Sequence, residues 1–261
     1  MSEIIGVAGC GRMGMGMLRN LQAAGFNTRG FDLRPLDGVG TDVDEFVDGL
    51  ATLITVVRDI PETDALLFAD QAVIAKAQDL ERIIVSSTLS PVYVKALRRR
   101  IAGHIALIDA PMSGAQVKAE AGTLTFMTGG PADQVAPLLR AMGEHAHHMG
   151  GLGAGMTAKV LNNLLAASNT AMTRLVLDWA DAEGLDEGKL LALIHTASGQ
   201  NWLASGFEKI EFARDGYAAD NTIGILAKDV ASALDIAPDD QIALPLAVQD
   251  SIRQLQPRRK R

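Results

Sequence analysis

One short stretch, GAGMTAKVLNNLL at residues 153–165, combines a side chain that can move a proton with side chains that can hold a polar ligand. Lys159, Asn162 and Asn163 have i, i+3 and i+4 spacing, so on a helix they share one face. The positive end of a helix disfavours an ammonium, so a lysine there exchanges its proton more readily. An asparagine amide can bind a substrate without taking its proton. The alternative is a lysine that packs its stem on the core and extends its ammonium into water.

A second pattern, GVAGCGRMGMGM at residues 6–17, is typical of a loop that binds phosphates. Its glycines follow a strand-like run, open a helical stretch and have the GxGxxG spacing. The first glycine permits a tight turn, the second lets the backbone approach a pyrophosphate and the third lets the helix pack on the sheet. We therefore expect a dinucleotide site formed by Gly9, Gly11, Arg12, Met13 and Gly14.

An acidic residue after the next strand-like run favours NAD over NADP. Asp32 lies close to the spacing of roughly 20 residues at which a carboxylate binds the adenosine ribose hydroxyls. A carboxylate there would also repel a 2′-phosphate. Arg34 leaves NADP open, because it could pair with a 2′-phosphate or remain a solvated loop cation.

The first half of the chain has the pattern of a doubly wound α/β domain. Short apolar runs alternate with amphipathic stretches, which is typical of a parallel sheet covered on both faces. The runs are EIIGVAG, FNTRGFD, TLITVVRD, RIIVSST and IALIDA. Later segments have only helical spacing. We expect a Rossmann-type NAD(P)-binding domain at residues 1–152, an all-helical substrate and oligomerisation domain at 153–261, and an active site in the cleft between them.

The first helix of the second half is expected to be unusually long. It runs from about Gly155 to Glu183, with Gly184 as a credible stop, and would measure about 42 Å at 1.5 Å per residue. One small domain does not cover a helix of that length. A homodimer or homotetramer is therefore expected.

Composition narrows the remaining possibilities. The 261 residues carry a formal net charge of −7, which argues against a nucleic-acid partner. A long apolar run and a signal peptide are both missing from the sequence, so we expect a cytoplasmic protein with no membrane partner. The basic end PRRKR is expected to be a frayed, solvated terminus, and HAHH at residues 145–148 to be solvated or packing histidines, with no metal site.

Together with the glycine loop, three further stretches resemble the β-hydroxyacid dehydrogenase family, which includes 3-hydroxyisobutyrate dehydrogenases and tartronate semialdehyde reductases. They are DAPMSGAQVKAEAGTLTFMTGG at 109–130, GAGMTAKVLNN at 153–163 and AKDV at 227–230. In this order they cover nearly the whole chain. The resemblance implies hydride transfer between a nicotinamide and the hydroxyl-bearing carbon of a short 3-hydroxy acid, or its semialdehyde.

The resemblance also implies roles for individual residues. Lys159 would be the general acid/base, and Asn163 would orient the substrate. Trp202 could wall the active site, although core packing is an equally plausible use. Substrate would be held by Ser113, Gly114, Ala115, Asn162, Trp202 and Asn221, and the cofactor also by Ser87, Thr88 and Lys228.

Three positions depart from the family pattern. Ala115 stands where the usual SGG motif has its second glycine, which adds a methyl group beside the carboxylate site. Asn221 replaces a common phenylalanine and suggests a more hydroxylated or charged substrate, and Leu175 stands where glutamate is frequent. Two alternatives stay open: a catalytically silent NAD-binding module, and an imine reductase-like enzyme, although relatives of the second kind usually replace the lysine.

Overall fold

The computed structural model of the chain describes residues 3–259 and falls into two compact units. The first unit is Met1–Lys159 and the second is Val160–Arg261. One helix, α8 (Ala154–Ala182), begins in the first unit and continues through the second. Within residues 3–259, no helix is both long and apolar enough to cross a lipid bilayer.

The first unit is built on a sheet whose five parallel strands have the order β2-β1-β3-β4-β5. Each of the five overlaps one of the runs predicted as strands. The order reverses beside β1, and in doubly wound sheets ligands bind outside the carboxyl ends of the strands at such a point. The strands are β1 (Ile4–Ala8), β2 (Thr28–Phe31), β3 (Leu50–Thr55), β4 (Arg82–Val85) and β5 (Ala106–Asp109).

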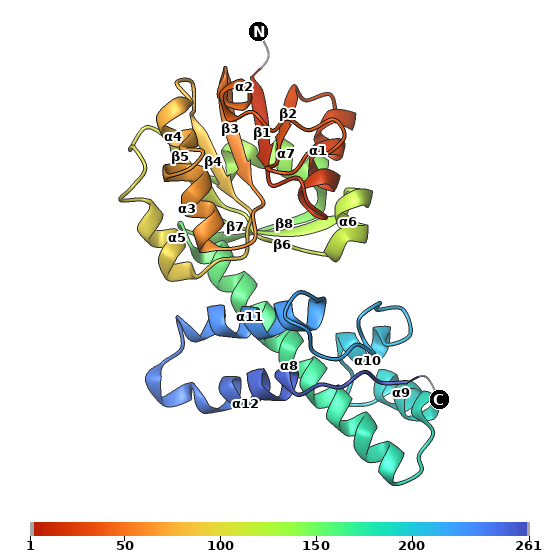
Figure 1. Ribbon diagram of the computed structural model, residues 1–261. Helices are drawn as coiled ribbons and strands as arrows, with labels where there is room; N and C mark the ends of the chain where they lie inside the picture. Colours follow the sequence, from red (N-terminus) through yellow and green to blue (C-terminus); the bar gives the residue numbers. More distant parts are fainter. Residues whose placement is uncertain (1–2, 260–261) are drawn as a thin grey trace. The chain divides into compact units, whose positions relative to one another are not determined.

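Helices cover both faces of this sheet (Figure 1). In β4, Ile83 and Val85 are buried in one hydrophobic cluster and Ile84 in the other, because successive side chains of a strand point to opposite faces. A strand buried on both sides is apolar throughout, which explains the continuous runs. One face carries α1 (Gly14–Ala23), α6 (Ala115–Ala121), η1 (Ala132–Val135) and α7 (Ala136–Met142), and the other carries α2 (Val43–Val47), α3 (Ile60–Phe68), α4 (Val73–Lys76) and α5 (Pro91–Leu97).

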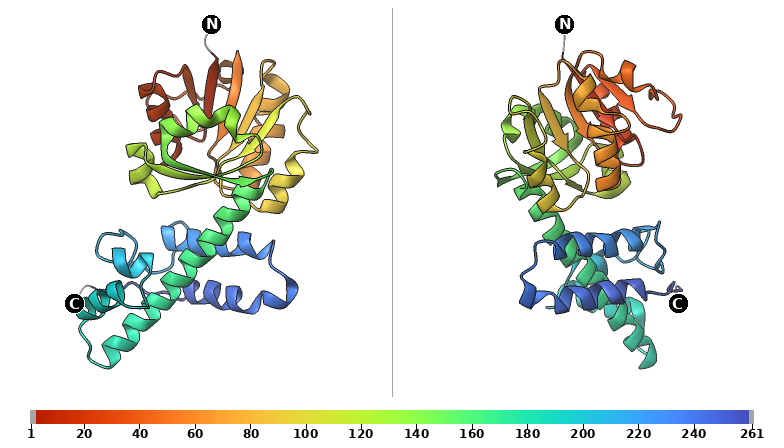
Figure 2. Two further views of the ribbon diagram at one scale, coloured as in Figure 1. Left: turned by 180° about the vertical axis from the view of Figure 1, so that it is seen from behind. Right: turned by 60° about the vertical axis from the view of Figure 1, so that its left-hand side comes forward.

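The far edge of the sheet differs from the expected parallel arrangement. Strand β7 (Leu124–Gly129) runs antiparallel to both β5 and β6 (Met112–Ser113), and β8 (Gly143–Gly150) pairs parallel with β7 (Figure 2, left). The HAHH stretch therefore lies in a strand. Its side chains are exposed, so β8 is held by backbone pairing with β7. An exposed strand has no apolar pattern, and for that reason it was not predicted.

The described residues of the second unit form helices only, as predicted. Helix α8 has 29 residues and is followed by Gly184 at φ +73°, where the Leu185 N–H returns to the Ala180 carbonyl. Helices α11 and α12 lie side by side and pack on the middle of α8 (Figure 2). The later elements are α9 (Glu187–Thr196), α10 (Trp202–Gly206), α11 (Thr222–Leu234), η2 (Asp239–Gln241) and α12 (Ala243–Arg253).

The prediction of a frayed, solvated basic end is wrong for Arg258, whereas Pro257 and Arg259 are exposed. The Arg258 side chain is only 6% exposed and pairs with Asp178, Asp181 and Glu187 at 2.6 to 2.8 Å. Three carboxylates from α8 and α9 therefore hold a side chain that the sequence pattern assigns to solvent. The last two residues of PRRKR lie outside the described residues.

Candidate functional site

The glycine-rich loop connects the carboxyl end of β1 to the start of α1. Gly9 has φ +93°, and a Cβ there would lie 2.6 Å from the Val56 carbonyl oxygen. A Cβ at Gly14 would overlap the Gly9 carbonyl. At Gly11, by contrast, only an Arg34 nitrogen lies within 4 Å, at 3.5 Å. The chain's own packing does not require glycine at position 11, whereas the close approach of a pyrophosphate does, so the loop fits a dinucleotide.

Asp32, directly after β2, is paired with Arg34. The Arg34 backbone N–H and Nε donate to Oδ1 at 3.0 Å, and a terminal guanidinium nitrogen donates to Oδ2 at 3.1 Å. Burial opposes ionisation of Asp32, but these hydrogen bonds prevail and hold the pKa of its carboxyl below the ordinary value. Asp32 is therefore an ionised carboxylate at neutral pH, at the position where the sequence predicted a ribose contact.

Ser87 and Thr88 follow β4 at the same carboxyl edge. Ser87 is buried, and both its N–H and its hydroxyl point to the Thr55 carbonyl, at 3.2 and 3.5 Å. Thr88 is half-buried. Arg12 and Met13 lie in the glycine loop itself, with Arg12 exposed and Met13 half-buried. The cofactor residues predicted in the first unit thus all follow β1, β2 or β4.

The carboxylate-binding candidates lie where β6 leads into α6. Ser113 ends β6, Gly114 has φ +140°, and Ala115 opens α6 with φ +55°. A positive φ is costly for a residue with a Cβ. The departure from the SGG motif therefore places alanine in a backbone conformation that favours glycine.

Lys159 and Asn163 lie one turn apart on α8, and each side chain is buried to the same degree, at 8% exposed. Lys159 belongs to the unit that contains the glycine loop. In the second unit, Asn163 Nδ2 donates to Asp229 Oδ2 at 2.6 Å, and Asn163 Oδ1 accepts from Asn162 Nδ2 at 3.3 Å. These bonds fix the orientation of the Asn163 amide. Asn162 itself is exposed.

Three further candidates have local roles in the second unit. Trp202 is 39% exposed and lies against Phe212, with ring centroids 6.1 Å apart. Asn221 caps α11, because Oδ1 accepts from the Gly224 N–H at 2.9 Å and Nδ2 donates to the Gly216 carbonyl at 2.8 Å. The capping use of Asn221 weakens the inference of a more polar substrate. Lys228 is exposed on α11.

Two buried acids were missed from the sequence. Asp229 orients Asn163, and Asp109, at the end of β5, accepts hydrogen bonds from the first turn of α8. Both lie inside quoted motifs, AKDV and DAPMSGA, so their positions were visible but their partners were not. Among residues 3–259, no group of three or more His, Cys, Asp or Glu residues is arranged to hold a metal ion.

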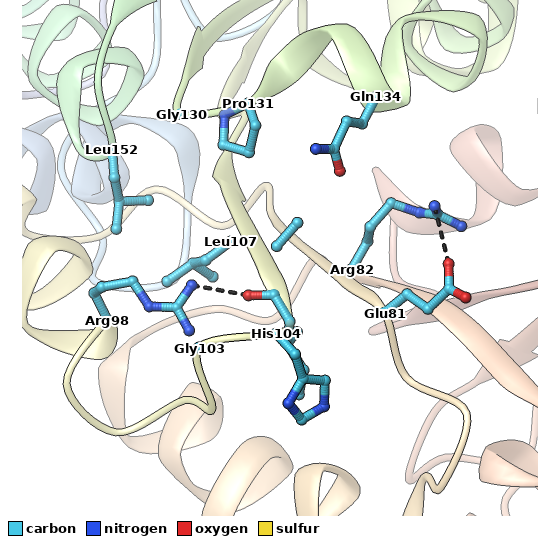
Figure 3. A pocket seen from close by; sticks show the side chains of 12 residues that line it. Glu81, Arg82, Arg98, Gly103, His104, Leu107, Gly130, Pro131, Gln134 and Leu152 are labelled. Atoms are coloured by element: carbon cyan, nitrogen blue, oxygen red, sulfur yellow. Dashed lines mark hydrogen bonds and ion pairs between the residues drawn. The ribbon is translucent and has the colours of Figure 1, made fainter.

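A cavity of about 770 Å³ in the first unit lies at the opposite edge of the sheet, beside the amino ends of β4 and β5 (Figure 3). Its cationic groups have partners within the chain. Arg82 pairs with Glu81 at 3.2 Å, and Arg98 donates to the Ile105 carbonyl at 2.8 Å. The glycine loop follows the carboxyl end of β1, so this cavity is separate from the dinucleotide-binding loop.

Comparison with known proteins matches both halves of the chain. Residues 4–151 match the family described as the NAD binding domain of 6-phosphogluconate dehydrogenase, and residues 153–256 match the NAD-binding family of NADP-dependent 3-hydroxyisobutyrate dehydrogenase. L-threonate dehydrogenase from Cupriavidus necator is 32% identical over 95% of this chain and 88% of its own. 3-Hydroxyisobutyrate dehydrogenase from Pseudomonas aeruginosa is 31% identical over 93% and 88%. The solved structure of Mycobacterium tuberculosis 3-hydroxyisobutyrate dehydrogenase with L-serine has a TM-score of 0.80 and 26% identity, covering 98% of this chain and 97% of that one.

Proposed function

This chain belongs to the β-hydroxyacid dehydrogenase family, as its motifs predicted, and from that premise we propose that it oxidises a short 3-hydroxy acid with Lys159 as general base. It is an oxidoreductase that acts on a CH–OH group. The observation that carries the proposal is a buried lysine in the same unit as the dinucleotide loop. A bound nicotinamide would supply the hydride acceptor or donor.

Lys159 moves the proton in this proposal. In oxidation its neutral amine takes the proton from the substrate hydroxyl, and in reduction its ammonium returns a proton to the carbonyl oxygen. Its burial supports the role, since interactions between a catalytic group and a bound substrate are stronger where water is excluded. Asn163 orients the substrate through its amide, which Asp229 and Asn162 hold in one orientation.

The substrate is proposed to be a short hydroxy acid held by its carboxylate. The Ser113 hydroxyl and the backbone N–H groups that follow it are suited to a carboxylate, because these donors are small and close together. Ala115 narrows the space beside them. The names of the two curated relatives point to the same class, since threonate and 3-hydroxyisobutyrate both combine a carboxylate with a hydroxyl group.

NAD is the proposed cofactor. Asp32 remains ionised, so it can accept hydrogen bonds from a ribose diol and repel a 2′-phosphate. Arg34 supports this choice, because its guanidinium is occupied by both carboxylate oxygens of Asp32. An arginine paired in this way is less available to a phosphate.

The proposed assembly is a homo-oligomer formed along α8. Five exposed apolar side chains follow one another at intervals of four, seven, three and four residues, which is the spacing of a coiled-coil seam. They are between 42% and 67% exposed. A second copy of the same helix offers a complementary apolar face, as in symmetric dimers. The side chains are Leu161, Leu165, Met172, Leu175 and Trp179.

A substrate screen tests the proposed function. Glycerate, 3-hydroxyisobutyrate, 4-hydroxybutyrate, threonate, serine and sulfonated propanediols, with the corresponding semialdehydes, would each be offered with NAD(H) and NADP(H) while nicotinamide absorbance is followed. We expect turnover of at least one hydroxy acid and faster turnover with NAD. A chain that binds NAD but turns over none of them would instead be the catalytically silent module.

A further inference from the structure

The start of α8 lacks the local residues that usually cap a helix. The N–H groups of the first turn have no acceptor within the helix, and a polar side chain at or near the start normally satisfies some of them. Here the residue before the helix is Gly153, which has no side chain, and the third helical residue is Met156, which offers no oxygen acceptor. The helix that carries Lys159 therefore cannot cap itself in the usual way.

Asp109 supplies both missing acceptors from another part of the fold. Its Oδ1 accepts from the Gly153 N–H at 2.7 Å and its Oδ2 from the Met156 N–H at 2.6 Å. The carboxylate is fully buried at the end of β5. Burial raises its pKa, while hydrogen bonds from Gly153 and Met156 act in the opposite direction. One side chain thus joins the sheet to the helix start with both of its oxygens.

The start of α8 is also closely packed against the first unit. A Cβ at Gly129 would overlap Asp109 Oδ1, and a Cβ at Gly155 would overlap the Met127 carbonyl. Met156 is fully buried, and its sulfur accepts from the Leu89 N–H at 3.3 Å. The first turn of α8 is therefore built into the first unit.

We propose that Asp109 is a positioning residue for Lys159: by fixing the first turn of α8 to the end of β5, it sets where the lysine stands relative to the carboxyl edge of the sheet. Lys159 follows Met156 by three residues, less than one turn of helix. A displaced first turn carries the lysine with it. The inference rests on the proposed acid–base role of Lys159.

Asp109→Asn is the test variant, because it keeps the size of the side chain but replaces one acceptor oxygen with an NH2 group that cannot accept. We expect kcat to fall by about 10- to 100-fold, the usual effect of a misplaced catalytic group, with the cofactor Kd and substrate KM unchanged within about threefold. Asp42→Asn is the matched control. Asp42 also accepts two backbone N–H groups at a helix start in the same unit, from Asp44 and Glu45, and its variant should retain kcat.

A double-mutant cycle separates this inference from the proposed function. If Asp109 acts through Lys159, Asp109→Asn has no further effect on kcat in a Lys159→Met background. Additive losses, or a kcat in Asp109→Asn equal to that of the unmodified chain, overturn the positioning role alone. An active Lys159→Met variant overturns the catalytic role of the lysine and the inference with it.

Hydrogen exchange in the unmodified chain covers the case in which Asp109→Asn does not fold. The Gly153 and Met156 amides should exchange at least about tenfold more slowly than the Asp44 and Glu45 amides, which also bond to an aspartate but at an exposed helix start. Equal exchange at the two helix starts shows that Asp109 does not anchor α8 and overturns the proposal.

Discussion

Arg258 donates from Nε to Glu187 Oε2 at 2.6 Å and so ties the end of the described chain to the start of α9. Arg214 donates to the other oxygen, Oε1, at the same distance. Burial of Glu187 opposes ionisation, but the hydrogen bonds from Arg214 and Arg258 prevail and hold its pKa below the ordinary value. The helical unit is therefore fastened by a buried ion-pair network.

Replacing Arg258 should destabilise this unit. Breaking a buried pair from one side costs about 3 to 5 kcal/mol, so Arg258→Gln should lower the free energy of unfolding by about 3 kcal/mol. Glu187 has a depressed pKa when folded, so this stabilisation is present above its unfolded pKa and is lost as the pH falls through its folded pKa. Both tryptophans, Trp179 and Trp202, lie in this unit, so fluorescence during urea unfolding at neutral and acidic pH measures the effect.

The control for this measurement is Arg253→Gln. Arg253 is 51% exposed and pairs with Asp250 at 3.5 Å, and exposed pairs contribute about 0 to 1 kcal/mol. Equal unfolding midpoints for the two variants would show that the Arg258 network contributes nothing to stability.

A second prediction concerns backbone strain at the carboxylate site. Ala115 has φ +55°, so Ala115→Gly should relieve strain and stabilise the chain by about 0.5 to 1 kcal/mol, the balance of the strain and the added freedom of the unfolded chain. It should also change the KM of the hydroxy acid. Ala72→Gly is the control, because Ala72 has φ +46° at the start of α4 and should change stability without changing KM. A lower melting temperature for Ala115→Gly would show that the positive φ of Ala115 does not destabilise the chain.

The sequence was informative where hydrophobic periodicity determines structure. The five parallel strands are apolar because both faces are buried, and α8 has helical spacing over its whole length. It was uninformative where backbone pairing decides, as in β8, and where partners are distant in the chain. The basic residues around Arg258 suggest a surface cation. Its partner Glu187 lies 71 residues away in the chain and comes into contact only in the folded structure.

The same limit applies to the candidate site. Spacing alone placed Gly9, Gly11 and Gly14 in one loop, because that motif is local. Asn221 suggested a more polar substrate because the family commonly has phenylalanine there. Its use as the cap of α11 depends on the backbone of the preceding turn, which the sequence does not show. Asp109 could be recognised only after β5 and α8 were seen together.

The cofactor preference can be tested at Asp32 and Arg34. The unmodified chain should bind NAD(H) at least about tenfold more tightly than NADP(H), the effect of one lost charge-assisted hydrogen bond. Arg34→Ala should keep NAD(H) binding and weaken NADP(H) binding, because an uncompensated Asp32 repels the 2′-phosphate more strongly. Titration of both cofactors measures this. Tighter NADP(H) binding that Arg34→Ala abolishes would reverse the assignment.

Assembly along α8 predicts a specific effect of charge. Leu165 is 67% exposed in the apolar stripe, so Leu165→Glu should shift the chain from dimer or tetramer toward monomer at micromolar concentration, because a carboxylate buried at a seam is unpaired. Val92→Glu is the matched control on α5, where the side chain is 56% exposed and lies outside the stripe. Light scattering gives the mass in solution, and a monomeric unmodified chain would rule out the assembly.

Lys159→Met tests the chemistry most directly. Methionine keeps most of the apolar stem and removes the ammonium, so turnover should fall by at least about 10²- to 10⁴-fold while NAD affinity, set by the separate glycine loop, stays nearly unchanged. The turnover of Asn163→Ala should lie between those of the unmodified chain and Lys159→Met. Its KM should rise, because the substrate loses the amide that Asp229 holds in place. Turnover and KM are measured on a substrate from the screen, and NAD affinity is measured in a parallel cofactor titration. Near-full activity of Lys159→Met would show that the lysine only packs its stem against the core, and the acid–base mechanism would fail.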